Sequence, residues 1–183
     1  TNYWAVTHPS EPNYMASVSG DYFALYDDIM VSLPKNVSTI ADLFDDKGIS
    51  FGSYQEHLPY TGFQGFNYSN QETFANDYVR KHNPLMLYDS YTSNATRLSV
   101  MKNFTEFERD LKDEKLPQYM IITPNMTNDA HDTNMKVAGK WTRDFMTPLL
   151  ENEYFINNTL VLITFDENET KGEQNTVYSI LLG

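Results

Sequence analysis

The nearly continuous apolar run Leu160-Val-Leu-Ile-Thr-Phe165 constrains the fold more than any other stretch of the sequence. It lacks the polar–apolar alternation of a half-exposed strand, which is typical of a strand covered on both faces of a parallel sheet. Tyr119-Met-Ile-Ile-Thr123 has the same character. Residues 134–151 lie between these two runs and carry apolar side chains at helical spacing. The alternation of such elements predicts an α/β fold with a mainly parallel sheet flanked by helices.

The remaining segments follow from the same patterns. Short strands are predicted at residues 2–6 and 49–51, a last strand at 176–182, and helices at residues 13–19, 38–47 and 103–112. Residues 54–91 are rich in Tyr, Gly, Asn and Pro without a clear period, which predicts a long functional surface loop. With 183 residues, the chain suits a single domain, 1–183, with one substantial core.

Charge restricts the partners. The formal net charge of −12 argues against nucleic acid and against anionic membranes, because both are bound through Lys and Arg. No apolar run reaches the roughly 20 residues that a membrane-spanning helix needs. An acidic protein that binds an anionic ligand needs local positive charge, and a bound metal ion supplies it simply.

The cellular compartment is indicated by asparagines rather than by cysteines, of which there are none. Asn-x-Ser/Thr sequons occur at Asn36, Asn67, Asn94, Asn103, Asn125, Asn157 and Asn168. Their number favours a secreted, extracellular or cell-wall glycoprotein carrying N-linked glycans, although chance matches in an intracellular protein are the alternative.

Three polar clusters follow predicted strands, at residues 7–13, 125–132 and 166–169. In open α/β sheets, ligands bind beyond the carboxyl ends of the strands, so these clusters are expected to meet. The first cluster places Ser10 in a tight strand-to-helix turn, where helix N–H groups could receive an anion. Taken alone, Ser10 is more simply a helix cap.

The other two clusters carry the ionisable groups. His131 lies in the second, where it could contact a phosphoryl oxygen or protonate a leaving group; the alternative is an Asx-rich turn. In the third, Asp166 and Glu167 follow the buried strand directly, and such a pair suits a hard divalent cation better than an ordinary solvated strand end. His8 could line the site, whereas His57 and His82 are expected to be exposed or locally bonded.

Four segments strongly resemble the fungal secreted acid phosphatases: Thr7-His-Pro-Ser-Glu-Pro-Asn-Tyr14, Tyr78-Val-Arg-Lys-His-Asn-Pro84, Ile122-Thr-Pro-Asn-Met-Thr-Asn-Asp-Ala-His-Asp-Thr133 and Thr164-Phe-Asp-Glu-Asn168. These enzymes belong to the phosphoesterase family, which also contains bacterial acid phosphatases and phosphocholine-preferring phospholipases C. The resemblance covers nearly the whole chain. It implies an alkaline-phosphatase-like fold and a covalent phosphoseryl intermediate.

The resemblance also implies roles for individual residues. Ser10 is the nucleophile and a metal ligand, and Asn13 completes the nucleophile motif and contacts substrate. Asp166 and Glu167 bind a divalent metal ion of unknown identity, and His131 holds the phosphate, with Asp129 and Asp132 as second choices.

Two family motifs, a Glu-Asn pair before the nucleophile and a His-Tyr-Ser-type segment after the last strand, have no counterpart here. The chain is therefore expected to be an incomplete domain.

Three functions remain open at the level of sequence. The first is an acid phosphatase that hydrolyses phosphate monoesters. The second is a phosphodiesterase of the phospholipase C type, for which the Tyr-rich residues 54–91 could form an aromatic cage around choline. The third is a catalytically silent surface glycoprotein.

Overall fold

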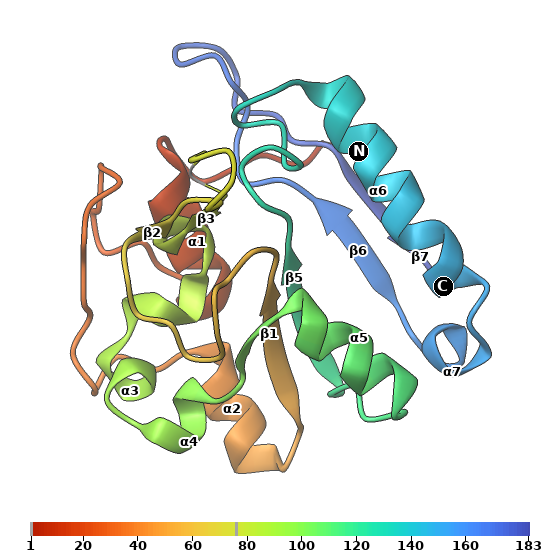
Figure 1. Cartoon of the computed structure of the whole chain (residues 1–183). Coiled ribbons are helices and arrows are strands. Elements are labelled where there is room, and N and C mark those ends of the chain that lie inside the picture. The colour runs from red at the N-terminus through yellow and green to blue at the C-terminus, as the bar shows by residue number, and fades with distance from the viewer. Residues whose placement is uncertain (1, 76) are drawn as a thin grey trace.

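A computed structural model describes residues 2–75 and 77–183, and Figure 1 shows how their helices and strands are arranged. The α-helices are α1 (Ser10–Ser19), α2 (Ile40–Lys47), α3 (Asp89–Thr92), α4 (Ala95–Leu98), α5 (Phe104–Lys112), α6 (Met135–Leu150) and α7 (Glu153–Ile156). Two 3₁₀ helices are η1 (Arg80–His82) and η2 (Pro84–Leu87). The strands are β1 (Phe51–Gln55), β2 (Asn67–Tyr68), β3 (Tyr78–Val79), β4 (Met101–Asn103), β5 (Tyr119–Thr123), β6 (Val161–Thr164) and β7 (Ser179–Leu182).

The central sheet is parallel, in the order β4-β1-β5, and this confirms the α/β fold class. Phe51 of β1 lies opposite Tyr119 of β5, and Ser53 of β1 lies opposite Met101 of β4. β6 pairs instead with β7 in an antiparallel ladder, in which Val161 faces Leu182. The last strand therefore belongs to a separate two-stranded sheet.

Two apolar clusters cover the two faces of the central sheet. On one face, Met15 and Val18 of α1 pack with Leu85–Leu87 and Met101. On the other, Phe107 of α5 packs with Met146 and Leu149 of α6. Figure 1 shows α5 and α6 on one side of the strands and α1 on the other. Helices therefore cover both faces of β1 and β5, as predicted for residues 119–123. The same prediction for residues 160–165 is wrong, because β6 pairs antiparallel with β7 and Leu162 is 60% exposed.

Residues 54–91 form the predicted surface loop only in part: Tyr60, Phe66 and Phe74 are exposed, but other aromatic residues of the segment are not. Tyr54, Tyr88 and Tyr91 are fully buried, and η2 lies inside the first core cluster. The absence of a simple period has a physical cause here: short 3₁₀ turns bury apolar side chains without a long helical or strand repeat. These tyrosines are core residues and cannot form an exposed aromatic cage.

Smaller differences concern element boundaries. The predicted strand at residues 2–6 is reduced to a single antiparallel bridge between Trp4 and Thr176. α1 begins at Ser10 rather than Asn13, since Pro12 fits the first turn of a helix, where no N–H is required. Gly20 ends α1 with a φ of 77°, as expected of a glycine cap.

Among the helices of the described residues, none combines the length and the apolar character needed to cross a membrane.

Candidate active site

Ser10 is the first residue of α1, and its side chain is directed at the acidic pair that follows β6. The residue is 5% exposed, and its Oγ donates a hydrogen bond to Oε1 of Glu167 at 3.0 Å. The cap position is occupied by Pro9, which makes no side-chain capping bond. The structure therefore excludes the helix-cap interpretation of Ser10 and brings the predicted nucleophile and Glu167 into contact.

Asn13 holds the turn that presents Ser10. Its Oδ1 accepts from the backbone N–H groups of Val6 (3.0 Å) and Thr7 (3.1 Å). Its Nδ2 donates to the carbonyls of Thr7 (2.8 Å) and Pro9 (3.2 Å). A side-chain amide has two donors and two acceptor sites, and all are used here. In this structure Asn13 shapes the turn, and its contact with substrate stays a prediction.

The acidic pair lies where β6 ends, as the sequence predicted. His8 Nδ1 pairs closely with Oε2 of Glu167, so Ser10 and His8 each contact one oxygen of the same carboxylate. Oδ2 of Asp166 is buried and has no hydrogen-bond partner. A buried carboxylate oxygen without a partner is costly unless a cation or another donor satisfies it.

Backbone pairing ties the nucleophile turn to the segment that follows the acidic pair. The N–H of Ala5 donates to the carbonyl of Asn175 (2.9 Å), and the N–H of Val177 donates to the carbonyl of Tyr3 (3.0 Å). Asn175 Nδ2 also donates to the carbonyl of Thr7 (2.7 Å). This tie fixes the distance between residues that are far apart in sequence.

Tyr14 and His82 belong to the same region, although the sequence interpretation left both out. Their rings stack at 5.0 Å between centroids, and His82 is 5% exposed. Burial raises the pKa of the Tyr14 hydroxyl well above its usual value, and the negative charges of Asp166, Asp129 and Glu167 raise it further. The hydroxyl therefore stays protonated beside the acidic groups.

The expectation that His82 is exposed or only locally bonded is wrong. Its Nδ1 lies 3.2 Å from Oδ2 of Asp129, in the loop after β5, and Nε2 is buried without a hydrogen-bond partner. The sequence offered one indication that His82 belongs to the site: it follows β3 within one of the four segments that resemble the family.

His131 lies at the margin of this region. It is exposed, its Nδ1 lies 3.1 Å from Oδ1 of Asp132, and its ring centroid is 6.0 Å from that of His82. Lys81 Nζ lies 3.3 Å from His131 Nε2 and 2.8 Å from Oδ2 of Asp28. Lys81 is a second residue that the sequence interpretation missed, and it brings a positive charge to this side of the site.

The start of α1 is a poorer anion receptor than predicted. The N–H of Glu11 already donates to Oδ1 of Asp28 at 2.9 Å, and Pro12 has no N–H. The Glu11 carboxyl is 1% exposed. Burial, with the nearby charge of Asp28, raises its pKa from 4.5 to about 7.

The side chains present fit a divalent cation as part of a ligand set. Asp166 and Glu167 offer carboxylate oxygens, the donors that hard cations prefer, and the unpartnered Oδ2 of Asp166 is the observation that favours one. Within residues 2–75 and 77–183, however, no three His, Asp or Glu side chains gather into a metal-binding group. A stable site needs further ligands beyond this pair.

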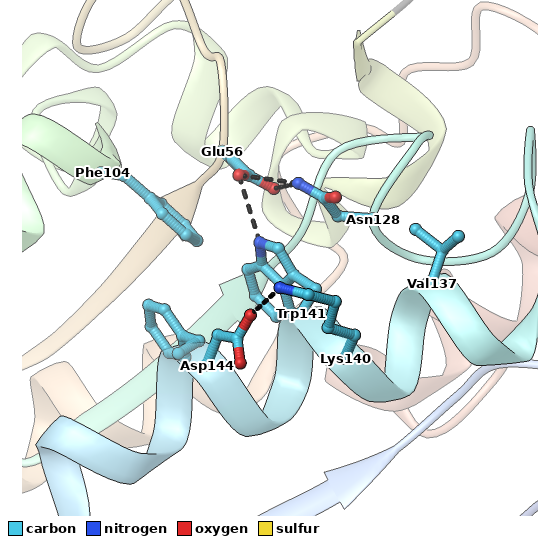
Figure 2. A pocket seen from close by; sticks show the side chains of 8 residues that line it. Glu56, Phe104, Asn128, Val137, Lys140, Trp141 and Asp144 are labelled. Atoms are coloured by element: carbon cyan, nitrogen blue, oxygen red, sulfur yellow. Dashed lines mark hydrogen bonds and ion pairs between the residues drawn. The ribbon is translucent and has the colours of Figure 1, made fainter.

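A separate hollow of about 320 Å³ lies between α5 and α6, and Figure 2 shows its lining. Trp141 stacks on Phe145 at 4.9 Å, and Trp141 Nε1 donates to Oε1 of Glu56 at 3.3 Å. Glu56 also accepts from Asn128 Nδ2 at 3.0 Å and from the N–H of Asn125 at 2.9 Å. These contacts anchor the loop that carries Asp129 and His131, but Ser10, Asp166 and Glu167 do not line the hollow.

The sequons differ in accessibility. Asn36, Asn67, Asn94 and Asn157 are exposed, whereas Asn103 and Asn168 are half-buried. Asn125 is 4% exposed, and its Nδ2 lies 3.0 Å from Nδ1 of His57. A glycan has no space at such a position, so the structure removes Asn125 from the candidate glycosylation sites.

Proteins of similar sequence include fungal and bacterial phosphatases. Over its whole length the chain is 67% identical to a probable acid phosphatase of Kluyveromyces lactis and 63% identical to an acid phosphatase of Aspergillus fumigatus. It spans only 44% and 41%, respectively, of these relatives. Over 98% of its length it is 28% identical to a phosphatidylinositol-3-phosphatase of Mycobacterium tuberculosis, of which it spans 56%. The model of the Phosphoesterase family matches residues 1–171, and the chain therefore belongs to that family.

Proposed function

We propose that the full-length protein is a secreted, N-glycosylated acid phosphatase that hydrolyses phosphate monoesters through a phosphoserine intermediate on Ser10. The contact between Ser10 Oγ and Glu167 Oε1 carries this proposal, since a serine hydroxyl needs an adjacent base or cation to act as a nucleophile. Membership of the Phosphoesterase family and the names of the fungal relatives support the class of reaction.

The cofactor in this proposal is a divalent metal ion. Asp166 and Glu167 would hold it, together with ligands that lie outside the described residues. When bound, it would supply positive charge that favours the serine alkoxide and offsets the charge of the phosphate.

In this proposal each side chain of the site has its own role in the reaction. Glu167 accepts the hydrogen bond of the Ser10 hydroxyl and so directs Oγ toward the phosphorus. Ser10 Oγ gives its proton to Glu167 and forms a bond to phosphorus while the bond to the ester oxygen breaks, and His131, when protonated, donates a proton to the leaving alcohol. Water then cleaves the phosphoserine and regenerates the hydroxyl. Lys81 contributes a positive charge near the phosphate oxygens.

Specific observations bear on the two alternative functions, a phospholipase C and a silent surface glycoprotein. The Tyr-rich segment suggested a choline-binding phospholipase C. Tyr54, Tyr78, Tyr88 and Tyr91 are buried in the core, whereas Tyr60 of the same segment is 61% exposed. The Mycobacterium tuberculosis relative is, by its name, also a phosphatase. A silent surface glycoprotein would need no buried serine–carboxylate contact.

The test is made on the full-length protein at acidic pH. The wild type is expected to hydrolyse p-nitrophenyl phosphate, and acid-quenched turnover should leave phosphate on the peptide that contains Ser10. Ser10→Ala should lower kcat by at least about 10³-fold. Ser17→Ala, at an exposed position of the same helix, is the matched control and should retain full activity.

Retained turnover in the Ser10→Ala variant would remove Ser10 from its role. Phosphatidylcholine and bis-p-nitrophenyl phosphate are assayed in parallel, and faster cleavage of either would favour the diesterase. Absence of any turnover and of any bound metal would favour the silent glycoprotein.

A further inference from the structure

Asp28, in the segment between α1 and α2, contacts two parts of the candidate site with its two carboxylate oxygens. Oδ1 accepts a hydrogen bond from the backbone N–H of Glu11 at 2.9 Å, and Oδ2 accepts one from Lys81 Nζ at 2.8 Å. Glu11 follows Ser10 directly in α1, whereas Lys81 belongs to η1. A single side chain therefore joins the start of the nucleophile helix to the lysine beside His131.

The position of Asp28 is fixed by its own neighbours. The backbone N–H of Asp28 donates to Oδ1 of Asp27 at 2.8 Å. The N–H of Ile29 donates to the carboxyl group of Glu11, so residues 28 and 29 both bond to Glu11. Asp28 is partly buried, although Asp27 and Ile29 are exposed. Its carboxylate is thus part of the structure around α1 and not a free surface group.

Lys81 is the strong base of η1 that faces the site. Its side chain is 15% exposed, and Nζ lies between Oδ2 of Asp28 and Nε2 of His131, at 2.8 and 3.3 Å. The guanidinium of the neighbouring Arg80 donates instead to the backbone carbonyl of Met86. A lysine ammonium stands on a flexible four-carbon chain and is strongly hydrated, so a lysine without a partner turns toward solvent. The carboxylate of Asp28 keeps Lys81 directed at the site.

We propose that Asp28 is a positioning residue of the phosphatase reaction, which fixes the ammonium group of Lys81 relative to Ser10. Asp28 does so by bonding to Lys81 and to the backbone of α1 at the same time. A positive charge that is already in place stabilises an anion without the cost of ordering a long side chain when the anion binds. The identity of the anion as a phosphoryl group rests on the proposed function, whereas the contacts of Asp28 do not.

Asp28 has two opposing effects on a bound anion. Its negative charge repels phosphate, so removal of the charge alone would tighten phosphate binding. Its contact with Lys81 favours the same phosphate, so loss of that contact would weaken binding. The sign of the change in phosphate affinity therefore distinguishes positioning from simple electrostatic repulsion.

The test measures the Kd of inorganic phosphate by titration calorimetry on the full-length protein at about pH 5.5, where an ordinary aspartate is ionised. Asp28→Asn should raise this Kd at least about fivefold, because the amide oxygen can accept from Glu11 or from Lys81 but the NH₂ group can accept from neither. Asp28→Glu keeps both acceptor oxygens and should stay within about threefold of the wild type. Asp27→Asn is the matched control: it removes the same charge one position away, its amide oxygen can still accept from the N–H of Asp28, and its Kd should stay within about twofold.

A double-mutant cycle shows whether the effect passes through Lys81. In the Lys81→Met background, Asp28→Asn should weaken phosphate binding by no more than about twofold, because no ammonium group remains to be positioned. Unchanged or tighter binding in Asp28→Asn with Lys81 present would overturn the inference. So would full weakening in the Lys81→Met background, because Asp28 would then act through α1 alone.

A second measurement uses the unaltered full-length protein and so does not depend on the folding of a variant. Acetic anhydride modifies accessible lysines, and mass spectrometry reports the rate at each one. Saturating inorganic phosphate should slow the acetylation of Lys81 at least about fivefold and leave the exposed Lys35 unaffected. Equal acetylation of Lys81 with and without phosphate would refute the inference. Both measurements follow phosphate binding alone, so a lack of phosphoserine at Ser10 would count against the proposed function only.

Discussion

Oγ of Ser10 lies 3.0 Å from Oε1 of Glu167, although the two residues are 157 positions apart in the chain. His8 contacts the other oxygen of the same carboxylate. Glu167 thus links the turn that carries the nucleophile to the loop that follows β6. The first prediction concerns this residue.

Glu167→Gln keeps the size of the side chain but removes its negative charge. We expect kcat of the full-length enzyme for p-nitrophenyl phosphate to fall by about 10²–10⁴-fold, because Ser10 loses its charged hydrogen-bond acceptor. Bound divalent metal, measured by elemental analysis after dialysis, should also decrease. Glu169→Gln changes an exposed residue of the same loop and should alter neither quantity. Equal activity of the two variants would show that Glu167 takes no part in catalysis.

Lys81→Met removes the positive charge next to His131 and Asp28. If Lys81 attracts the phosphate, KM should rise about 10-fold or more and depend less on ionic strength, while Lys81→Arg should restore most of the affinity. Steady-state kinetics at several salt concentrations measure this. The control is Lys35→Met, an exposed lysine of the loop before α2. An unchanged KM in Lys81→Met would limit the residue to its ion pair with Asp28.

Asn13→Ala leaves the N–H groups of Val6 and Thr7 without their acceptor in a partly buried turn. We expect the free energy of unfolding to fall by about 2–3 kcal/mol, as measured by urea denaturation. Because the turn positions Ser10, kcat should fall while KM stays nearly constant. A rise in KM alone, with stability unchanged, would instead return Asn13 to the substrate-binding residues. Asn36→Ala, at an exposed position, controls for the loss of an amide.

Glu11→Gln tests the buried carboxyl beside Ser10. Burial raises its pKa in the fold from 4.5 to about 7, so the folded state holds a proton that the unfolded state releases. The stabilising contribution is therefore complete below pH 4.5 and is lost as the pH rises through about 7. The wild type should lose on the order of 2 kcal/mol of stability across this window from Glu11, and Glu11→Gln should not.

Urea denaturation at several pH values between 4 and 8 gives this comparison. Parallel pH profiles of the two proteins would show that Glu11 titrates normally. The contribution of Glu11 to stability is largest where its carboxyl is protonated.

The sequence predicted the acidic pair well because its position depends on local properties. A strand that ends directly before Asp166 and Glu167 can be recognised from residue types alone. Ser10 was singled out by its strand-to-helix turn. Its contact with Glu167 depends on the backbone pairing of residues 3–5 with residues 175–177, which no local pattern shows.

The predictions failed where burial depends on distant segments. His82 appeared exposed because its neighbours in sequence are polar, yet Tyr14 of α1 stacks on it. The role of Asn13 in the turn was missed because no local pattern shows that four backbone groups bond to its amide. The antiparallel pairing of β6 with β7 could not be predicted from local sequence either, because the residues of a strand do not show whether its partner runs parallel or antiparallel.

The bridge between Trp4 and Thr176 has a consequence for how this protein tolerates change. Residues 168–175 form a closed excursion whose two ends are pinned, one by the acidic doublet and the other by the bridge. Because both ends are pinned, a residue added or deleted within the excursion is absorbed by the path between them, and Glu167 keeps its place after β6. The length of this excursion should therefore vary more freely than the contacts at its two ends.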